Sequence, residues 1–119
     1  MKLNRIAIVS IPVKDVEQAR QFYVEKLGFV VKRDNPFGET RWVEVAPEHG
    51  ETSVVLVTWF PHISPVDGFV VDVDDIEDVY KTLQERGVEV TPLESAPWGR
   101  FTTLHDPDGN GWVFQQAAM

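Results

Sequence analysis

Cysteine is absent from the 119-residue chain, so the sequence excludes disulfide bonds and thiol chemistry. Basic residues are in the minority, because 11 lysines and arginines stand against 19 acidic residues, for a formal net charge of −8. A phosphate backbone repels a protein of this charge, so we expect no nucleic-acid partner. No apolar run approaches the roughly 20 residues that a membrane-spanning helix needs. We therefore predict a cytoplasmic protein with no membrane partner.

The length and the ordinary share of apolar residues, 43%, fit one domain around one core. We predict a single domain over residues 1–119 that consists of two pseudo-repeat halves, 1–62 and 63–119. The acidic charge either keeps the surface soluble or steers a cationic ligand towards the protein, and it does not choose between these roles.

Two segments have the apolar spacing of amphipathic helices. The first begins after Asp15, with Gln18 in the position of a capping-box partner, and ends at Gly28. The second begins after Asp75 and ends before Gly87 in the same manner. Around these helices the pattern predicts eight β-strands, near residues 5–11, 29–34, 41–46, 53–59, 68–73, 88–92, 100–105 and 111–116.

The order of one strand, one helix and three strands occurs twice along the chain. Residues 8–15 align with residues 68–75 at an offset of 60, and Leu56 aligns with Val113 at an offset of 57. A doubly wound parallel sheet would need a helix between most consecutive strands. The sequence therefore predicts the α+β class, with two βαβββ modules whose curled mixed sheets surround a cleft.

Three segments carry a resemblance to a known superfamily: IAIVSIPVKDVEQARQFYVEKLGF, GFVVDVDDIEDVYKTLQERGVEV and HDPDGNGWVFQQ. With them the chain resembles the vicinal oxygen chelate superfamily, which includes glyoxalase I, extradiol dioxygenases, fosfomycin-resistance enzymes and bleomycin-resistance proteins. The resemblance covers nearly the whole chain. It implies paired βαβββ modules, a homodimer, and a cavity lined by the concave faces of the sheets.

Metal-dependent members of this superfamily take His, Gln or Glu ligands from the first, fourth, fifth and eighth strands. The positions that resemble these ligands are occupied by Ile8, Leu56, Gly68 and Val113. None of the four side chains offers a donor atom to a cation. The resemblance thus implies no metal and no other cofactor, and it favours the metal-free binding branch typified by bleomycin-resistance proteins.

The sequence from Asp106 to Gly111 matches the first half of an EF-hand loop, but the twelfth position is Ala117 and not glutamate. We interpret it as a hairpin turn. The three histidines, His49, His62 and His105, are too scattered for a spaced ligand pair. His49 fits a polar turn. His62 follows the fourth strand, where it either closes a cleft across a dimer or packs on the preceding proline.

Strand alternation predicts which side chains face the cleft. The side that holds the four former ligand positions also holds Ile6, Ser10, Val54, Thr58, Val70, Asp72 and Gln115. The predicted ligand-binding residues are Trp42, Glu44, Trp59, Phe60, Phe101, Thr103, His105 and Gln115. Taken singly, each aromatic residue also fits ordinary core packing. Trp98 and Arg100 are placed at the rim of the cleft, with a surface salt bridge as the alternative for Arg100.

An aromatic wall with a few polar groups suits a planar or cationic organic ligand. The leading hypothesis is therefore metal-independent binding and sequestration of a small aromatic or cationic organic molecule. The alternative is an enzyme of the superfamily, a lyase, isomerase or dioxygenase-like protein, with Glu44 or His105 as general base. A third hypothesis is a protein with a filled interior whose surface mediates assembly.

Overall fold

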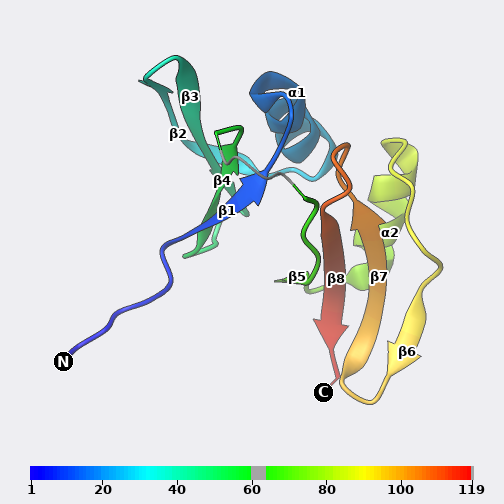
Figure 1. The fold of residues 1–119 in the computed structure, drawn as a ribbon. Coiled ribbons are helices and arrows are strands. Elements are labelled where there is room, and N and C mark those ends of the chain that lie inside the picture. The colour runs from blue at the N-terminus through cyan, green and yellow to red at the C-terminus, as the bar shows by residue number, and fades with distance from the viewer. Residues whose placement is uncertain (60–63, 119) are drawn as a thin grey trace. The chain divides into compact units, whose positions relative to one another are not determined.

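The computed structural model describes residues 1–59 and 64–118, which fall into two units, 1–64 and 65–119. The first unit contains β1 (Ile8–Pro12), α1 (Val16–Gln21), a π-helical turn η1 (Phe22–Lys26), β2 (Val30–Phe37), β3 (Thr40–Ala46) and β4 (Ser53–Val57). The second contains β5 (Phe69–Asp72), α2 (Ile76–Glu85), β6 (Glu94–Ala96), β7 (Gly99–His105) and β8 (Gly111–Ala117) (Figure 1). This order confirms the predicted α+β class and the two βαβββ modules. The predicted boundary between residues 62 and 63 lies outside the described residues, so the halves and the single domain stay predictions.

Each unit has one four-stranded mixed sheet, with the strand orders β1-β4-β3-β2 and β5-β8-β7-β6. The first strand of each unit pairs in parallel with the last strand, and the remaining pairs are antiparallel. Helix α1 packs against β3 and β4, and helix α2 packs against β7 and β8. Each sheet therefore has one face covered by its own helix.

Both helices begin and end as their sequences predict. The Asp15 carboxylate accepts a hydrogen bond from the backbone N–H of Gln18 at 2.9 Å, and the Asp75 carboxylate accepts one from Asp78 at 3.2 Å. These bonds satisfy backbone donors that have no partner within the helix. Gly28 has a φ of 76°, a left-handed conformation that a residue with a Cβ adopts only at a cost.

The first helix contains a π-helical turn that its apolar spacing does not reveal. The N–H of Leu27 bonds the carbonyl of Phe22, five residues back, at 3.2 Å. The N–H of Phe29 bonds the carbonyl of Tyr23, six residues back, at 2.9 Å. The turn holds one more residue than an α-helical turn would, and it seats the fully buried Tyr23 ring against Phe29.

The two sheets are packed against their helices by apolar side chains. In the first unit Ile11, Val43, Val45 and Leu56 are fully buried, together with Ala19 of α1. In the second unit the buried residues include Ile76, Leu83, Leu104, Trp112 and Phe114. At roughly 25 cal/mol per Å² of apolar surface removed from water, such side chains are the main stabilising term in each unit.

The strand predicted at residues 88–92 is wrong, because the sixth strand is formed by residues 94–96. The N–H of Val88 is used by the end of α2, where it bonds the carbonyl of Leu83. Pro92 has no N–H to give to a sheet. Of the five residues 88–92, Thr91 is the one that bonds β7. Its N–H donates to the carbonyl of Thr103, and its side chain accepts a hydrogen bond from the N–H of Thr103 at 2.9 Å.

The turn that begins at Asp106 is built from its own hydrogen bonds, as the hairpin interpretation predicts. The Asp106 carboxylate accepts bonds from the N–H groups of Asp108 and Asn110, at 2.9 and 2.8 Å. His49 lies in the exposed turn before β4, as expected. Within the part of the chain that the structure describes, neither helix is long and apolar enough to cross a lipid bilayer.

Candidate functional site

Three aromatic rings form a cluster in the first unit. Phe37 lies at the end of β2, Trp42 lies on β3, and Trp59 follows β4. The ring centroids of Trp42 and Trp59 are 6.0 Å apart with an angle of 22° between their planes. Phe37 lies 5.5 Å from Trp42 and 4.9 Å from Trp59. These separations fall within the range of roughly 4.5–7 Å typical of favourable aromatic pairs. We call Phe37, Trp42 and Trp59 the aromatic cluster.

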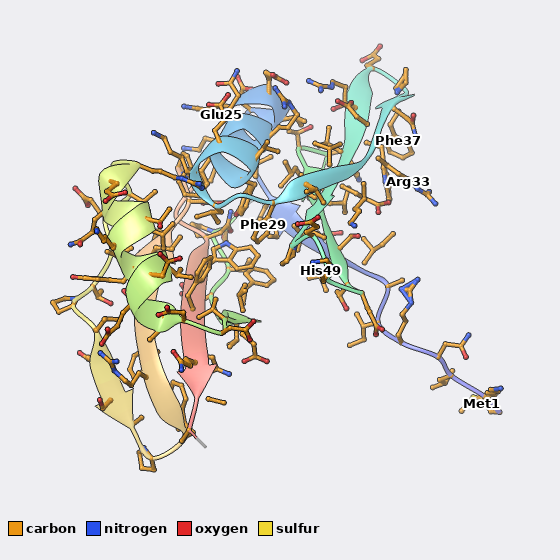
Figure 2. All side chains as sticks on the ribbon, turned by 180° about the vertical axis from the view of Figure 1, so that it is seen from behind. Met1, Glu25, Phe29, Arg33, Phe37 and His49 are labelled. Atoms are coloured by element: carbon orange, nitrogen blue, oxygen red, sulfur yellow. The ribbon has the colours of Figure 1, made fainter. Side chains whose placement is uncertain are left out.

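The β2–β3 hairpin sets the positions of two of these rings. Gly38 has a φ of 59° in the turn, which lets the chain reverse immediately after Phe37. Figure 2 shows Phe37 near the tip of this hairpin and Arg33 farther back along the same strand. The Phe37 residue is 46% exposed. Phe37 was not among the predicted site residues, although its place just before the turn glycine and its distance of five residues from Trp42 are the pattern of a cross-strand neighbour.

A buried carboxylate lies beside the aromatic cluster. Glu44 follows Trp42 by two residues on β3, so the two side chains project from the same face of the sheet. The Trp42 Nε1–H donates a hydrogen bond of 2.7 Å to Oε1 of Glu44, and Glu44 is only 5% exposed. Burial of a charged group is costly unless donors or counter-charges surround it. The structure therefore brings Trp42, Glu44 and Trp59 together, as an aromatic surface with an acceptor at its edge.

The only basic group that the structure places near Glu44, among the described residues, is Arg33. Its Nε lies 3.8 Å from Oε1 of Glu44, beyond hydrogen-bond distance. Arg33 is directly opposite Glu44 in the β2–β3 pairing, and its side chain is 65% exposed. The pair is thus an ion pair between a buried anion and a largely solvated cation.

The opposite face of the hairpin is fixed to α1 by a second group of charges. Arg41 donates to Asp34 of β2 at 2.7 Å and to Glu17 of α1 at 2.8 Å. Hydrogen bonds from Arg20 and Arg41 lower the pKa of Glu17 to about 2, and the two carboxylates raise the pKa of Arg41. This arrangement orients the hairpin that carries Phe37 and Trp42.

The second unit repeats this ion pair, since Arg100 of β7 donates to Glu77 of α2 at 2.8 Å. Arg100 and Arg41 are 59 residues apart, and Glu77 and Glu17 are 60 apart, in agreement with the internal repeat. Of the two roles expected for Arg100, the structure thus shows the salt bridge. Arg41 and Arg100 thus project from the face of each sheet that the helix covers.

The register of the first sheet corrects the predicted face of Leu56. Glu44 lies opposite Val55, and Val55 also pairs with Ser10 of β1. Leu56 pairs with Ile11, on the face that α1 covers. Val54, which was predicted to share a face with Ile8, pairs with the core residue Val45 and lies on the helix side too. The strand is apolar from Val54 to Val57, so its sequence contains no alternation from which the faces could be assigned.

The same pairing corrects the repeat alignment by one residue. Ser10 pairs with Val55 in the first unit, and its counterpart Val70 pairs with Val113 in the second. Val113 is therefore equivalent to Val55 at an offset of 58, and not to Leu56.

These positions do not fit a metal ion. Ile8, Val55 and Val113 carry only aliphatic side chains, and Gly68 carries none, so none of them supplies a lone pair to a cation. Nowhere in residues 1–59 and 64–118 do three or more His, Cys, Asp or Glu side chains gather in a group that could hold a metal ion.

The second unit carries the other predicted site residues on the face away from α2. Phe101 lies opposite Gln115, and Thr103 lies opposite Val113. Gln115 donates from Nε2 to Asp72 at 2.8 Å. The half-exposed Trp98 stacks on Phe101, with ring centroids 4.9 Å apart. Two stacked rings and an amide–carboxylate pair thus share one surface.

His105 ends the same strand and is exposed, with Nε2 3.9 Å from Oδ1 of Asp67, whose side chain is more exposed still. An exposed pair at this distance is a weak interaction. The predicted catalytic role of His105, like that of Glu44, stays a prediction. Phe60 and His62 lie outside the described residues.

Comparison with known proteins identifies the family. A family model named Glyoxalase/Bleomycin resistance protein/Dioxygenase superfamily matches residues 2–114. The chain belongs to this superfamily. It is 41% identical to TnmS3, an antibiotic binding protein from Streptomyces sp. CB03234, with 99% of each chain covered and a TM-score of 0.94. It is 43% identical to a glyoxalase/bleomycin resistance protein from the same organism, with 94% of this chain and 100% of the other covered and a TM-score of 0.86.

A curated protein is also similar over most of its length. The uncharacterized protein YetH of Bacillus subtilis (strain 168) is 31% identical over 122 residues, which cover 96% of this chain and 99% of YetH. The resemblance drawn from the three sequence segments is confirmed by the family match. The superfamily contains both binding proteins and enzymes, so membership alone assigns no activity.

Proposed function

We propose that this protein binds and sequesters a small planar organic molecule without the help of a metal ion. The observation that carries the proposal is the aromatic cluster beside the buried carboxylate of Glu44. Ring faces supply stacking and apolar contact, and a carboxylate at their edge supplies a hydrogen-bond acceptor or a counter-charge. Similarity to TnmS3, which is an antibiotic binding protein, supports the same function.

The proposed site comprises Phe37, Trp42, Glu44 and Trp59 in the first unit. In the second unit, Phe101, Thr103, His105 and Gln115 form a further contact surface for the same ligand class. We propose that both units act in one domain, and that the protein works as a cytoplasmic homodimer. The aliphatic residues at the former ligand positions support binding that needs no metal.

Titration calorimetry and tryptophan fluorescence test this function. The probes are three planar compounds, acridine, 10-methylacridinium and 1,4-dihydroxyanthraquinone. We expect at least one of them to bind and to quench the emission of Trp42 and Trp59. Replacement of Phe37 by alanine should weaken that binding roughly 3- to 10-fold, since an aromatic pair contributes about 0.5–1.5 kcal/mol beyond its buried area.

Val31→Ala is the matched control for Phe37→Ala. Val31 is 40% exposed on the same strand, and it pairs with Val45 of the opposite face. Its truncation should leave the affinity unchanged. The proposal is overturned if all three probes give no binding heat and no quenching, or if Phe37→Ala and Val31→Ala bind the probes equally well.

A further inference from the structure

The ion pair between Arg33 and Glu44 differs from the other ion pairs of the first unit. Arg41 contacts its two carboxylates at 2.7 and 2.8 Å through hydrogen bonds, whereas Nε of Arg33 stays 3.8 Å from Oε1 of Glu44. The Glu44 side chain is only 7% exposed, while that of Arg33 is 65% exposed. The guanidinium thus neutralises the charge at a distance without forming the two-point contact that arginine makes with a carboxylate.

Among the described residues, one side chain donates a hydrogen bond to Glu44. Oε1 accepts the indole N–H of Trp42, which carries no charge. Among the described residues, the structure gives no hydrogen bond to Oε2 of Glu44. A carboxylate can accept about four hydrogen bonds, and its burial is favourable only when charged or strong donors surround it. Glu44 therefore keeps the capacity to receive a second cation at the edge of the Trp42 ring.

We propose that Arg33 is a displaceable internal counter-ion, and that the ligand of this site is a planar organic cation whose positive group replaces the guanidinium at Glu44. This inference rests on the proposed function and names its ligand class. Rings of Trp and Phe attract a cation over their faces, and the attraction increases when the cation leaves water. Arg33 can swing into solvent, so its departure requires no change in the sheet.

We expect the affinity of a ligand for this site to depend on its charge as well as on its shape. A neutral ring of the same size gains the contacts with the aromatic cluster but cannot replace Arg33, so it binds beside an intact ion pair. A cation gains the same contacts and also pairs with Glu44, in competition with Arg33. Removal of Arg33 should therefore help the cation and leave the neutral compound unaffected.

The test compares 10-methylacridinium, a permanent cation, with acridine at a mildly alkaline pH, where acridine is neutral and has the same ring system. Calorimetric titration of the full-length protein should show tighter binding of the cation. Arg33→Gln should strengthen the binding of 10-methylacridinium about 2- to 5-fold, the range expected when a partly exposed ion pair no longer competes, and should leave acridine unchanged.

Lys32→Gln provides the matched control. Lys32 precedes Arg33 on the same strand, and its Nζ reaches the carbonyl of Glu48 at 3.4 Å. The substitution makes the same change in net charge, so it reveals any effect of long-range steering. We expect Lys32→Gln to alter the affinity for both probes by less than about 2-fold.

Glu44→Gln completes a double-mutant cycle with Arg33→Gln, because it removes the anion while keeping an acceptor for the Trp42 indole. The preference for 10-methylacridinium over acridine should disappear, and Arg33→Gln should have no effect in that background. The inference is overturned if acridine binds as tightly as the cation, if Arg33→Gln weakens the cation, or if Lys32→Gln matches Arg33→Gln. In each of these cases binding persists and the proposed function survives; if no planar probe binds, both fail.

Discussion

The Asn110 side chain joins two segments of the second unit, so its removal is a sharp test of the turn that precedes β8. Asn110 is fully buried. Its Nδ2 donates to Oδ2 of Asp106 at 2.8 Å, and its Oδ1 accepts the backbone N–H of Val66 at 3.0 Å. Asn110→Ala eliminates both bonds and leaves the N–H of Val66 without this acceptor.

The magnitude follows from the two bonds. A hydrogen bond to a charged group contributes about 1.5–3 kcal/mol and a neutral one about 0.5–1.5 kcal/mol, so Asn110→Ala should lower the free energy of unfolding by about 3 kcal/mol. With a urea dependence of about 2 kcal/mol per M, the unfolding midpoint should fall by about 1.5 M.

Urea unfolding followed by circular dichroism measures this change, with Asn4→Ala as the control. Asn4 is exposed and lies outside the secondary structure, so its truncation should cost less than about 0.5 kcal/mol. Calcium and a chelator should leave the midpoint of the wild type unchanged, because Asp106 already accepts hydrogen bonds within the turn. Equal midpoints for Asn110→Ala and Asn4→Ala would show that the two Asn110 bonds do not stabilise the turn, and a rise of the midpoint with calcium would show that the turn binds the ion.

Two further substitutions test the ion network and a close backbone approach. The pKa of Glu17 falls from 4.5 to about 2 in the folded protein, so its stabilisation is complete above pH 4.5 and is lost towards pH 2. The difference in unfolding free energy between wild type and Glu17→Gln should therefore stay constant down to about pH 5 and shrink from there towards pH 2 in urea titrations, and a difference that does not change over this range would refute the network. Gly99→Ala would drive a Cβ into the carbonyl oxygen of Gln116, so it should cost about 1–3 kcal/mol or more. Gly38→Ala, at a φ of 59° in open space, should cost roughly 1 kcal/mol, and equal costs in thermal unfolding would contradict the close approach of Gly99 to Gln116.

The sequence predicted the parts of the fold that depend on local signals. Asp15 and Asp75 cap the helices because their side chains bond backbone groups three residues away, a relation visible in the sequence itself. The sixth strand was misplaced because Val88, Val90 and Thr91 form a β-prone run, whereas the use of the Val88 N–H by the preceding helix decides where pairing can start.

Only part of the candidate site was predictable from the sequence. Trp42 and Glu44 were found because the flanking valines on β3 alternate with them. Leu56 was assigned to the wrong face because β4 is apolar from Val54 to Val57, and its register follows only from its pairing with β1 and β3. The contact of Arg33 with Glu44 depends on the cross-strand pairing of β2 with β3, which no local pattern encodes.

The π-helical turn at Phe22–Lys26 has a consequence for protein engineering. A helix with one surplus residue tolerates a single-residue deletion inside the turn, since the chain then relaxes to ordinary α-helical bonding and the residues that follow keep their phase. A deletion in the regular α-helical turn before it has no surplus residue to remove, so it would rotate everything after it by about 100° about the helix axis. The π-helical turn is therefore the place in this helix where the chain can be shortened without redirecting Gly28 and Phe29 as they enter β2.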